Sequence, residues 1–201
     1  MTQDAAAQEI VKTMPPGLAA LIARAGKGAG RPPVERWNPP HCGKIDMRVA
    51  ADGSWHYMGS PINREPLVRL FASVMRREPD GSICLVTPVE KIEIEVDDAP
   101  FVVVELHADG VGDDQSITVR TNVGDVVTIG HEYPLLFDEE MGTEGLKPYV
   151  LVRPGLEALV ARHLVFELVD LADETASSET ELIVRSAGIA FSSSANRRSQ
   201  S

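Results

Sequence analysis

The chain has 201 residues, of which 43% are hydrophobic, and it carries a net charge of −11 with a pI near 4.9. This length and composition suffice for a substantial core in one large or two small domains, whereas the negative charge disfavours nucleic acid as a partner. No segment resembles a membrane span or a secretory signal, and two cysteines are too few for a disulfide framework, so we expect a cytoplasmic protein that binds no membrane.

Residues 1–35 are expected to form a tail, a short helix and a linker. An amphipathic helix is predicted over residues 18–25, directly after two prolines and a glycine. The glycine-rich run at residues 26–30 has the composition of a phosphate-binding loop, but no strand precedes it and Lys27 is not followed by Ser or Thr. We interpret it as a flexible linker.

Residues 36–78 are the segment around which the predicted fold is organised. Hydrophobic residues alternate along residues 45–49 and again along 55–57, with Asp52-Gly53 between them, which predicts a tight β-hairpin. The hydrophobic period then changes to that of a helix over residues 66–77. The first unit is therefore predicted to be strand, strand, helix.

Further strands are predicted at short apolar or alternating segments, namely residues 83–86, 89–96, 101–106, 117–120, 126–129, 149–152, 181–184 and 188–191. The acidic loop at residues 109–114 is interpreted as a hairpin turn, because its spacing does not fit a twelve-residue calcium loop. Residues 131–147 are predicted to be a long irregular loop, a kind of connection that is more often functional or mobile than ordinary.

A repeat is predicted from the alignment of residues 47–59 with residues 118–130, which places Gly53 opposite Gly124. A second helix is predicted from Pro154 to about Leu171. The predicted fold class is α+β, with two pseudo-repeated β-β-α units that have mostly antiparallel sheets and form two closely packed subdomains. We place the first repeat at residues 36–108 and the second at residues 109–191, followed by a disordered tail at residues 192–201.

Several motifs carry a resemblance to a known family: GKIDM at 43–47, DGSWHY at 52–57, GSPINR at 59–64, TPVEK at 87–91, DAPF at 98–101, RTN with GD at 120–125, and the approach to the second helix at 149–156. In this order they resemble the proteobacterial domain-of-unknown-function family twelve-eighty-five over residues 36–191. The resemblance implies a two-part α+β fold with repeated substructures and a role in signalling or regulation, and it supplies no catalytic residue. The closing segment of that family usually contains a tryptophan and paired glycines, which residues 184–191 lack.

Candidate ligand-binding residues lie around the first hairpin and at the two predicted helix starts: Asp46, His56, Tyr57, Asn63, Arg64 and Arg153. Aromatic side chains beside a guanidinium group, which can bind a carboxylate with two parallel hydrogen bonds, suit a small acidic ligand. We expect this ligand to bind where the two units meet. In the alternative interpretation the aspartates cap turns, the arginine pairs with a carboxylate, and the aromatic residues belong to the core.

The sequence assigns no metal, cofactor or catalytic residue. Its histidines and cysteines lack zinc-ligand spacing, and no G-x-S-x-G motif occurs. We therefore predict a ligand- or protein-binding regulatory module in signal transduction, with a small acidic ligand or a protein as partner and no nucleic acid. The alternative is a small hydrolase or transferase that uses His56 or His131 with nearby acids.

Overall fold

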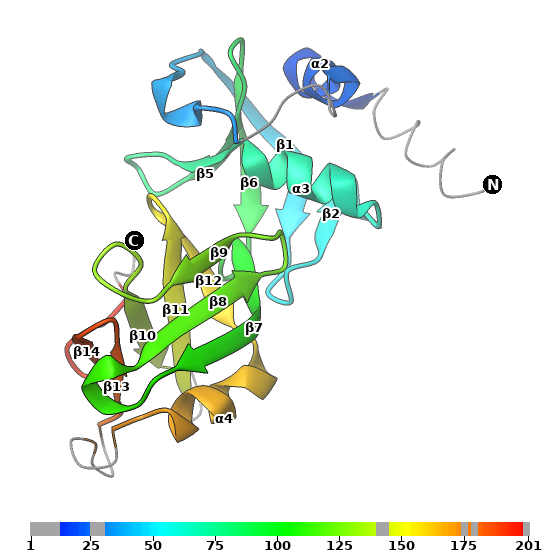
Figure 1. Ribbon diagram of the computed structural model, residues 1–201. Coiled ribbons are helices and arrows are strands. Elements are labelled where there is room, and N and C mark those ends of the chain that lie inside the picture. Colours follow the sequence, from blue (N-terminus) through cyan, green and yellow to red (C-terminus); the bar gives the residue numbers. More distant parts are fainter. Residues whose placement is uncertain (1–12, 25–30, 140–144, 174–176, 178–180, 199–201) are drawn as a thin grey trace. The chain divides into compact units, whose positions relative to one another are not determined.

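A computed structural model of the chain describes residues 13–24, 31–139, 145–173, 177 and 181–198. The chain divides into two compact units between residues 98 and 99, each with its own six-stranded sheet (Figure 1). Together with three α-helices among the described residues, these sheets make the mixed α+β fold that the sequence predicts. The division lies before residues 101–109, ten residues ahead of the expected boundary, because that strand pairs only with strands of the second unit.

Among its described residues, the first unit, residues 1–98, contains two α-helices, one 3-10 helix and a sheet in the strand order β3-β2-β1-β6-β5-β4. Only β1 and β6 pair in parallel, and the other neighbours are antiparallel. In chain order the elements are α2 (Pro16–Arg24), η1 (Val34–Arg36), β1 (His41–Val49), β2 (Trp55–Tyr57), β3 (Ser60–Pro61), α3 (Glu65–Ser73), β4 (Met75–Arg77), β5 (Ile83–Val86) and β6 (Lys91–Val96).

The predicted hairpin and the short helix near the N-terminus are both confirmed. Strands β1 and β2 pair antiparallel, with Val49 opposite Trp55, and Gly53 in the loop has a φ of 82°, which favours glycine. The Trp55 ring stacks on Phe71 of α3 with 6.1 Å between ring centroids, and both side chains are buried. Hairpin and helix therefore share one core, which is the reason for the change of hydrophobic period between them.

Helix α3 is shorter than predicted, because it ends at Ser73 and residues 75–77 form strand β4. The helix buries Leu67 and Phe71 at a spacing of four residues. Met75 continues that pattern of apolar residues, but it pairs with Leu85 across β4 and β5. A contact made with a strand ten residues further along the chain ends the helix, and no local signal marks this end.

The second unit, residues 99–201, contains a six-stranded sheet in the order β10-β11-β12-β7-β8-β9 and a separate two-stranded sheet. Again a single neighbouring pair, β7 and β12, is parallel. The elements are β7 (Phe101–Asp109), η2 (Gly112–Asp114), β8 (Ser116–Thr121), β9 (Val126–Thr128), β10 (Leu135–Glu139), β11 (Leu146–Arg153), β12 (Leu156–Val160), α4 (Arg162–Asp170), β13 (Ile183–Ser186) and β14 (Ile189–Ser192).

The second helix does not begin at Pro154, and this prediction is wrong. Arg153 and Leu156 are paired residues of β11 and β12, joined by Pro154 and by Gly155 with a φ of 67°, which is the residue pattern of a type II turn. The helix, α4, begins only at Arg162. Arg153 is therefore not at a helix start, and the second unit does not have the order β-β-α, since three further strands separate β9 from α4.

Two segments that were predicted to be irregular contain ordered pairing. The expected long loop at residues 131–147 contains β10 and the first residues of β11, and residues 140–144 lie outside the described part of the chain. Of the expected disordered tail, Ser192 belongs to β14, and residues 196–198 lie along β10. The backbone N–H of Phe137 donates to Asn196 O at 2.8 Å, and that of Arg198 donates to Phe137 O at 2.8 Å. The predicted linker at residues 26–30 lies outside the described residues.

The two sheets have the same strand order when each strand is numbered within its unit, which gives 3-2-1-6-5-4 with the first and sixth strands parallel. The loops at Gly53 and Gly124 also share one geometry. Each glycine has a positive φ and donates its backbone N–H to the carbonyl oxygen of the residue three positions earlier. That residue is Ala50 for Gly53 and Thr121 for Gly124. However, the Gly53 loop joins the first two strands of its sheet, whereas the Gly124 loop joins the second and third strands. The aligned segments are therefore similar hairpins at different places in the strand order.

Candidate functional site

The predicted site residues of the first hairpin divide between the two faces of the sheet. His56 lies opposite Arg48 and is half-buried, with its Nε2 3.0 Å from Ser54 Oγ, and Asp46 is exposed two residues along the strand from Arg48. Tyr57 lies on the other face and is buried. Asp46 and His56 therefore share a face from which Tyr57 is excluded, because neighbouring residues of a strand point to opposite sides.

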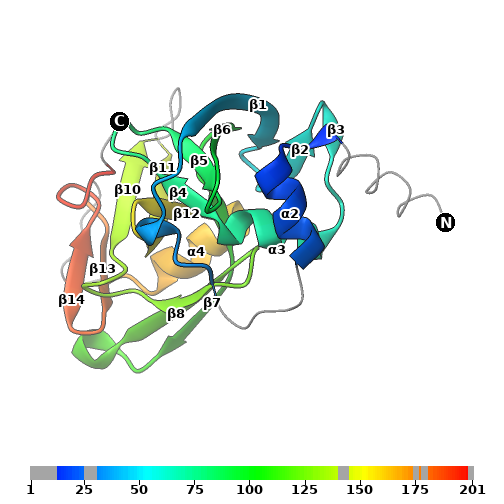
Figure 2. The same cartoon turned by 90° about the horizontal axis from the view of Figure 1, so that it is seen from above.

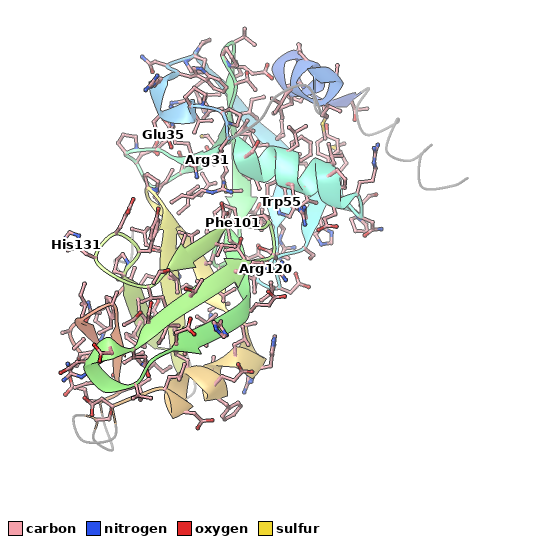
Figure 3. All side chains as sticks on the ribbon, viewed as in Figure 1. Arg31, Glu35, Trp55, Phe101, Arg120 and His131 are labelled. Carbon is pink, nitrogen blue, oxygen red and sulfur yellow. The ribbon has the colours of Figure 1, made fainter. Side chains whose placement is uncertain are left out.

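Asn63 and Arg64 are exposed at the start of α3, where Arg64 occupies the N-cap position. Asp52 accepts a hydrogen bond from the Ser54 backbone N–H at 2.9 Å, so it stabilises the hairpin turn. Trp55 belongs to the core (Figure 3), as the alternative interpretation of the aromatic residues expected.

Arg153 is buried and is held by residues of its own unit. Its guanidinium lies 4.6 Å from the centroid of the Phe101 ring and donates to both carboxylate oxygens of Asp125, at 3.2 and 2.7 Å. Asp125 in turn follows the Gly124 loop, where its backbone N–H donates to Thr121 Oγ1 at 3.0 Å. This arrangement fixes the loop against β7 by a bidentate ion pair and a cation–π contact.

The histidines of the alternative enzymatic hypothesis do not gather at one place. His56 is half-buried, and the other four are exposed, namely His41, His107, His131 and His163. His131 lies on the segment that leads into β10 (Figure 3). In the described part of the chain, no three His, Cys, Asp or Glu residues are grouped so that they could hold a metal ion.

A pocket of about 370 Å³ lies in the second unit, where the end of α4 meets η2 and β13. Its lining comes from three segments that are far apart in the sequence: Gly112, Asp113 and Gln115, residues 171–173, and Arg185. Its volume is in the range of cavities that hold small ligands. None of the five histidines lines it, and neither does any of the predicted site residues.

Gln115 forms a fixed part of this pocket. Its side-chain amide donates to Leu171 O at 3.0 Å and to Arg185 O at 2.7 Å, so it ties the end of α4 to β13. Both amide hydrogens are thereby used. The residue is only 7% exposed, and among the described residues no hydrogen bond to Oε1 is found. The pocket thus offers one positioned carbonyl acceptor.

Arg185 is the cation of the pocket and contacts two aspartates of unequal exposure. Its Nε donates to Asp173 Oδ2 at 2.7 Å, and its NH1 lies 3.2 Å from Asp113 Oδ1. The Asp173 side chain is 18% exposed and the Asp113 side chain 89%. The hydrogen bond to Asp173 raises the pKa of Arg185, an effect that burial opposes. The pocket therefore combines a permanent positive charge with acceptors on either side.

Sequence reasoning missed this pocket. The sequence predicts an ordinary hairpin turn for the acidic loop at residues 109–114, and it marks Arg185 only as part of the closing segment. In that segment Arg185 lies on the less buried face of a short strand, between the buried residues Val184 and Ser186, which is the usual place of a solvent-facing arginine. Nothing in the sequence joins it to Gln115.

The described helices include none that is both long and apolar enough to cross a bilayer. Two family models match the chain, described as the N-terminal domain of DUF1285, a domain of unknown function, over residues 32–99, and the C-terminal domain of the DUF1285 protein of unknown function over residues 100–192. Against curated proteins the chain has no match.

Two solved structures are similar to the chain. The crystal structure of a DUF1285 family protein from Silicibacter pomeroyi DSS-3 is 45% identical with a TM-score of 0.79, and the alignment covers 89% of this chain and 94% of that one. The crystal structure of a DUF1285 family protein from Shewanella baltica OS155 is 23% identical with a TM-score of 0.48, and the alignment covers 63% of this chain and 91% of that one.

Proposed function

The chain belongs to the DUF1285 family, and we propose that it is a cytoplasmic regulatory module that binds a small ligand and has no catalytic activity of its own. The observation that carries the proposal is the pocket around Arg185, in which two aspartates contact the guanidinium and the Gln115 amide holds the Arg185 backbone oxygen. Two free thiols, Cys42 and Cys84, suit a reducing compartment. The regulatory role and its connection with signal transduction rest on the resemblance to the family.

The chemistry of the pocket favours a small carboxylic acid. The ion pair between Arg185 and the exposed Asp113 is of the surface type, which contributes about 0–1 kcal/mol. A ligand carboxylate can therefore take the place of Asp113 at Arg185 NH1 and make the same charge-assisted hydrogen bond. An amino or hydroxyl group on the ligand would donate to Gln115 Oε1. A small amino acid or hydroxy acid combines both groups.

A protein ligand is the other form of this proposal, because an exposed carboxylate side chain of a partner could occupy the same place. The volume of about 370 Å³ favours the small ligand, since it lies within the range of pockets that bind small molecules. Binding would then stabilise the contact between α4 and β13, which Gln115 bridges, and so change the surface that these two elements present.

We also infer that the two units are versions of one folding block. The shared strand order and the shared loop geometry at Gly53 and Gly124 support this inference. The helices differ in position, since α3 precedes the fourth strand of its unit and α4 follows the sixth. The pocket at Arg185 depends on α4 and β13, so it belongs to what distinguishes the second unit.

Isothermal titration calorimetry of the full chain with four probes tests the proposal. L-Lactate and L-serine carry a carboxylate and a donor, propionate carries the carboxylate alone, and ethanolamine carries the donors alone. We expect the first two to bind about tenfold more tightly than the last two, and we expect Arg185→Met to remove their binding. If neither L-lactate nor L-serine binds, or if Arg185→Met binds them as the unaltered chain does, the proposal is wrong.

A further inference from the structure

Helix α2 is attached to the first unit by a polar contact at its N-terminus. The backbone N–H of Leu18, in the first turn, donates to Glu90 Oε1 at 2.9 Å, and the helix lies beside the turn that precedes β6 (Figure 1, Figure 2). Leu18 is fully buried and Glu90 is only 7% exposed. A carboxylate at this position accepts a hydrogen bond from an amide that has no partner within the helix, and it complements the helix dipole.

The turn that carries Glu90 holds itself in place. The Glu90 backbone N–H donates to Thr87 Oγ1 at 3.1 Å, and the Thr87 backbone N–H donates to Glu90 O at 2.9 Å. These bonds lie within residues 87–90 and do not involve α2. The backbone that carries the Glu90 side chain is therefore held by its own turn, independently of the helix.

The contact selects for particular residues at the start of the helix. A Cβ atom on Gly17 would lie 2.5 Å from Glu90 Oε1 and 2.6 Å from Thr87 Oγ1, so a side chain does not fit there without a shift. The next residue, Leu18, is fully buried. Three residues before the helix, the Tyr57 hydroxyl donates to Thr13 O at 3.0 Å. The surface thus distinguishes a glycine followed by a large aliphatic residue.

Helix α2 is too short to be stable by itself. It has nine residues, whereas isolated helices shorter than about twelve residues are marginal in water, so its docking and its helicity depend on each other. Such elements open more readily than the core to which they are bound. A site that recognises a helix start through a fixed carboxylate can then accept the same feature from another chain.

We propose that Tyr57, Thr87 and Glu90 form a recognition site for helix starts of the type Gly-Leu, that α2 is its intrachain ligand, and that a partner protein with such a helix start binds there by displacing α2. The partner's helix has glycine at its second position, a large aliphatic residue at its third, and no acidic residue in its first turn, where Glu90 would repel it. This site lies in the first unit and is independent of the pocket at Arg185.

The test uses a fluorescein-labelled peptide of residues 13–24 as the probe and fluorescence anisotropy of full-length chains. In the unaltered chain α2 occupies the site at the high effective concentration of a tethered ligand, so the peptide must compete with it. The Leu18→Asp chain has a disabled α2 and an intact site. We expect it to bind the peptide at least about tenfold more tightly than the unaltered chain does, and we expect Glu90→Gln added to Leu18→Asp to reverse this gain.

Two controls separate specific binding from misfolding. Gly17→Val in the full chain disables α2 by a clash with Glu90 in place of a buried charge, and it should open the site equally. The peptide with Gly17→Val should bind none of the chains, whereas a partly unfolded chain would capture both peptides. If both disabled chains bind the peptide no more tightly than the unaltered chain does, or if Glu90→Gln has no effect, the proposal is overturned.

Discussion

Glu78 is the centre of an ion network in the first unit, and its substitution by glutamine gives the most quantitative prediction. The carboxylate accepts hydrogen bonds from Arg76 Nε at 2.6 Å and from Lys91 Nζ at 2.5 Å. The Glu78 side chain is 9% exposed, and those of Arg76 and Lys91 are 17% and 18% exposed. Glu78→Gln removes the negative charge and leaves two cations close together in a partly buried site.

The magnitude follows from this burial. Loss of one partner of a buried ion pair costs about 3–5 kcal/mol. Arg76 keeps its bonds to Val34 O and Trp37 O, both at 2.7 Å, and neither cation is fully buried, so the lower end of that range applies. We expect the free energy of unfolding of the first unit to fall by about 3 kcal/mol at about pH 7.

The pH dependence of the unfolding free energy tests whether the charge of the Glu78 carboxylate is the source of the lost stability. Burial acts to raise the pKa of Glu78, but the hydrogen bonds from Arg76 and Lys91 outweigh it, so the pKa lies below its ordinary value of 4.5. A lowered folded-state pKa means that the stabilisation is complete above the ordinary value and is lost as the pH falls through the folded value. The difference between the unaltered chain and Glu78→Gln should therefore be complete above the ordinary value and shrink as the pH falls below it.

Urea unfolding followed by tryptophan fluorescence measures the effect in the right unit, because both tryptophans of the chain, Trp37 and Trp55, lie in the first unit. Glu95→Gln is the matched control, since the Glu95 side chain is 59% exposed and lies 3.7 Å from Lys44 Nζ. It should change the unfolding free energy by less than about 0.5 kcal/mol. Equal effects of the two substitutions, or a Glu78→Gln effect that does not vary with pH, would refute the reasoning.

Two further predictions concern the turn after β11 and the two thiols. Gly155→Val should destabilise the second unit by about 1–2 kcal/mol, because valine must adopt the positive φ of 67°, and circular dichroism during urea unfolding measures this; an unchanged midpoint would contradict the assigned turn. An aromatic disulfide reagent should modify Cys42 alone in the folded chain and both cysteines in urea, because Cys84 is 1% exposed and its burial raises the pKa of the thiol. Two equally fast thiols in the folded chain would contradict this burial.

Local signals were sufficient where a segment has one hydrophobic period and a clear turn. The first hairpin was predictable because Asp52-Gly53 separates two alternating runs. The second helix was misread because residues 156–164 fit both periods. Leu156, Ala158 and Val160 are buried on β12, yet Leu156 and Val160 also have helical spacing. Pro154-Gly155 was the signal that decides for a turn.

The rest of the fold depends on pairing between distant segments, which no local pattern records. Strand β12 lies beside β7, with Ala158 opposite Phe101, and this parallel pair determines where the second unit begins. The segment after β14 is ordered by backbone bonds to Phe137 and by Arg198, whose guanidinium lies 4.1 Å from the centroid of the Tyr149 ring. The sequence around Arg198 is polar and resembles a disordered tail by composition alone.

The candidate site also depends on contacts between distant segments, so it could be predicted only in part. Tyr57 and Arg153 were selected for their residue types, and the structure uses both, the first to hold the start of α2 and the second to fix a loop. The pocket at Arg185 was missed because its lining is assembled from three separate segments. A buried glutamine that ties a helix end to a strand leaves no trace in the spacing of residues.

The most direct measurement of the proposed function is the affinity for L-lactate or L-serine of two neighbouring charge variants, Asp113→Asn and Asp114→Asn. Both lie in η2 and both remove one negative charge, but Asp113 alone competes for Arg185. We predict that Asp113→Asn tightens binding about two- to fivefold, while Asp114→Asn leaves it unchanged at physiological salt. Equal affinities for the two variants, or weaker binding by Asp113→Asn, would contradict a carboxylate site at Arg185.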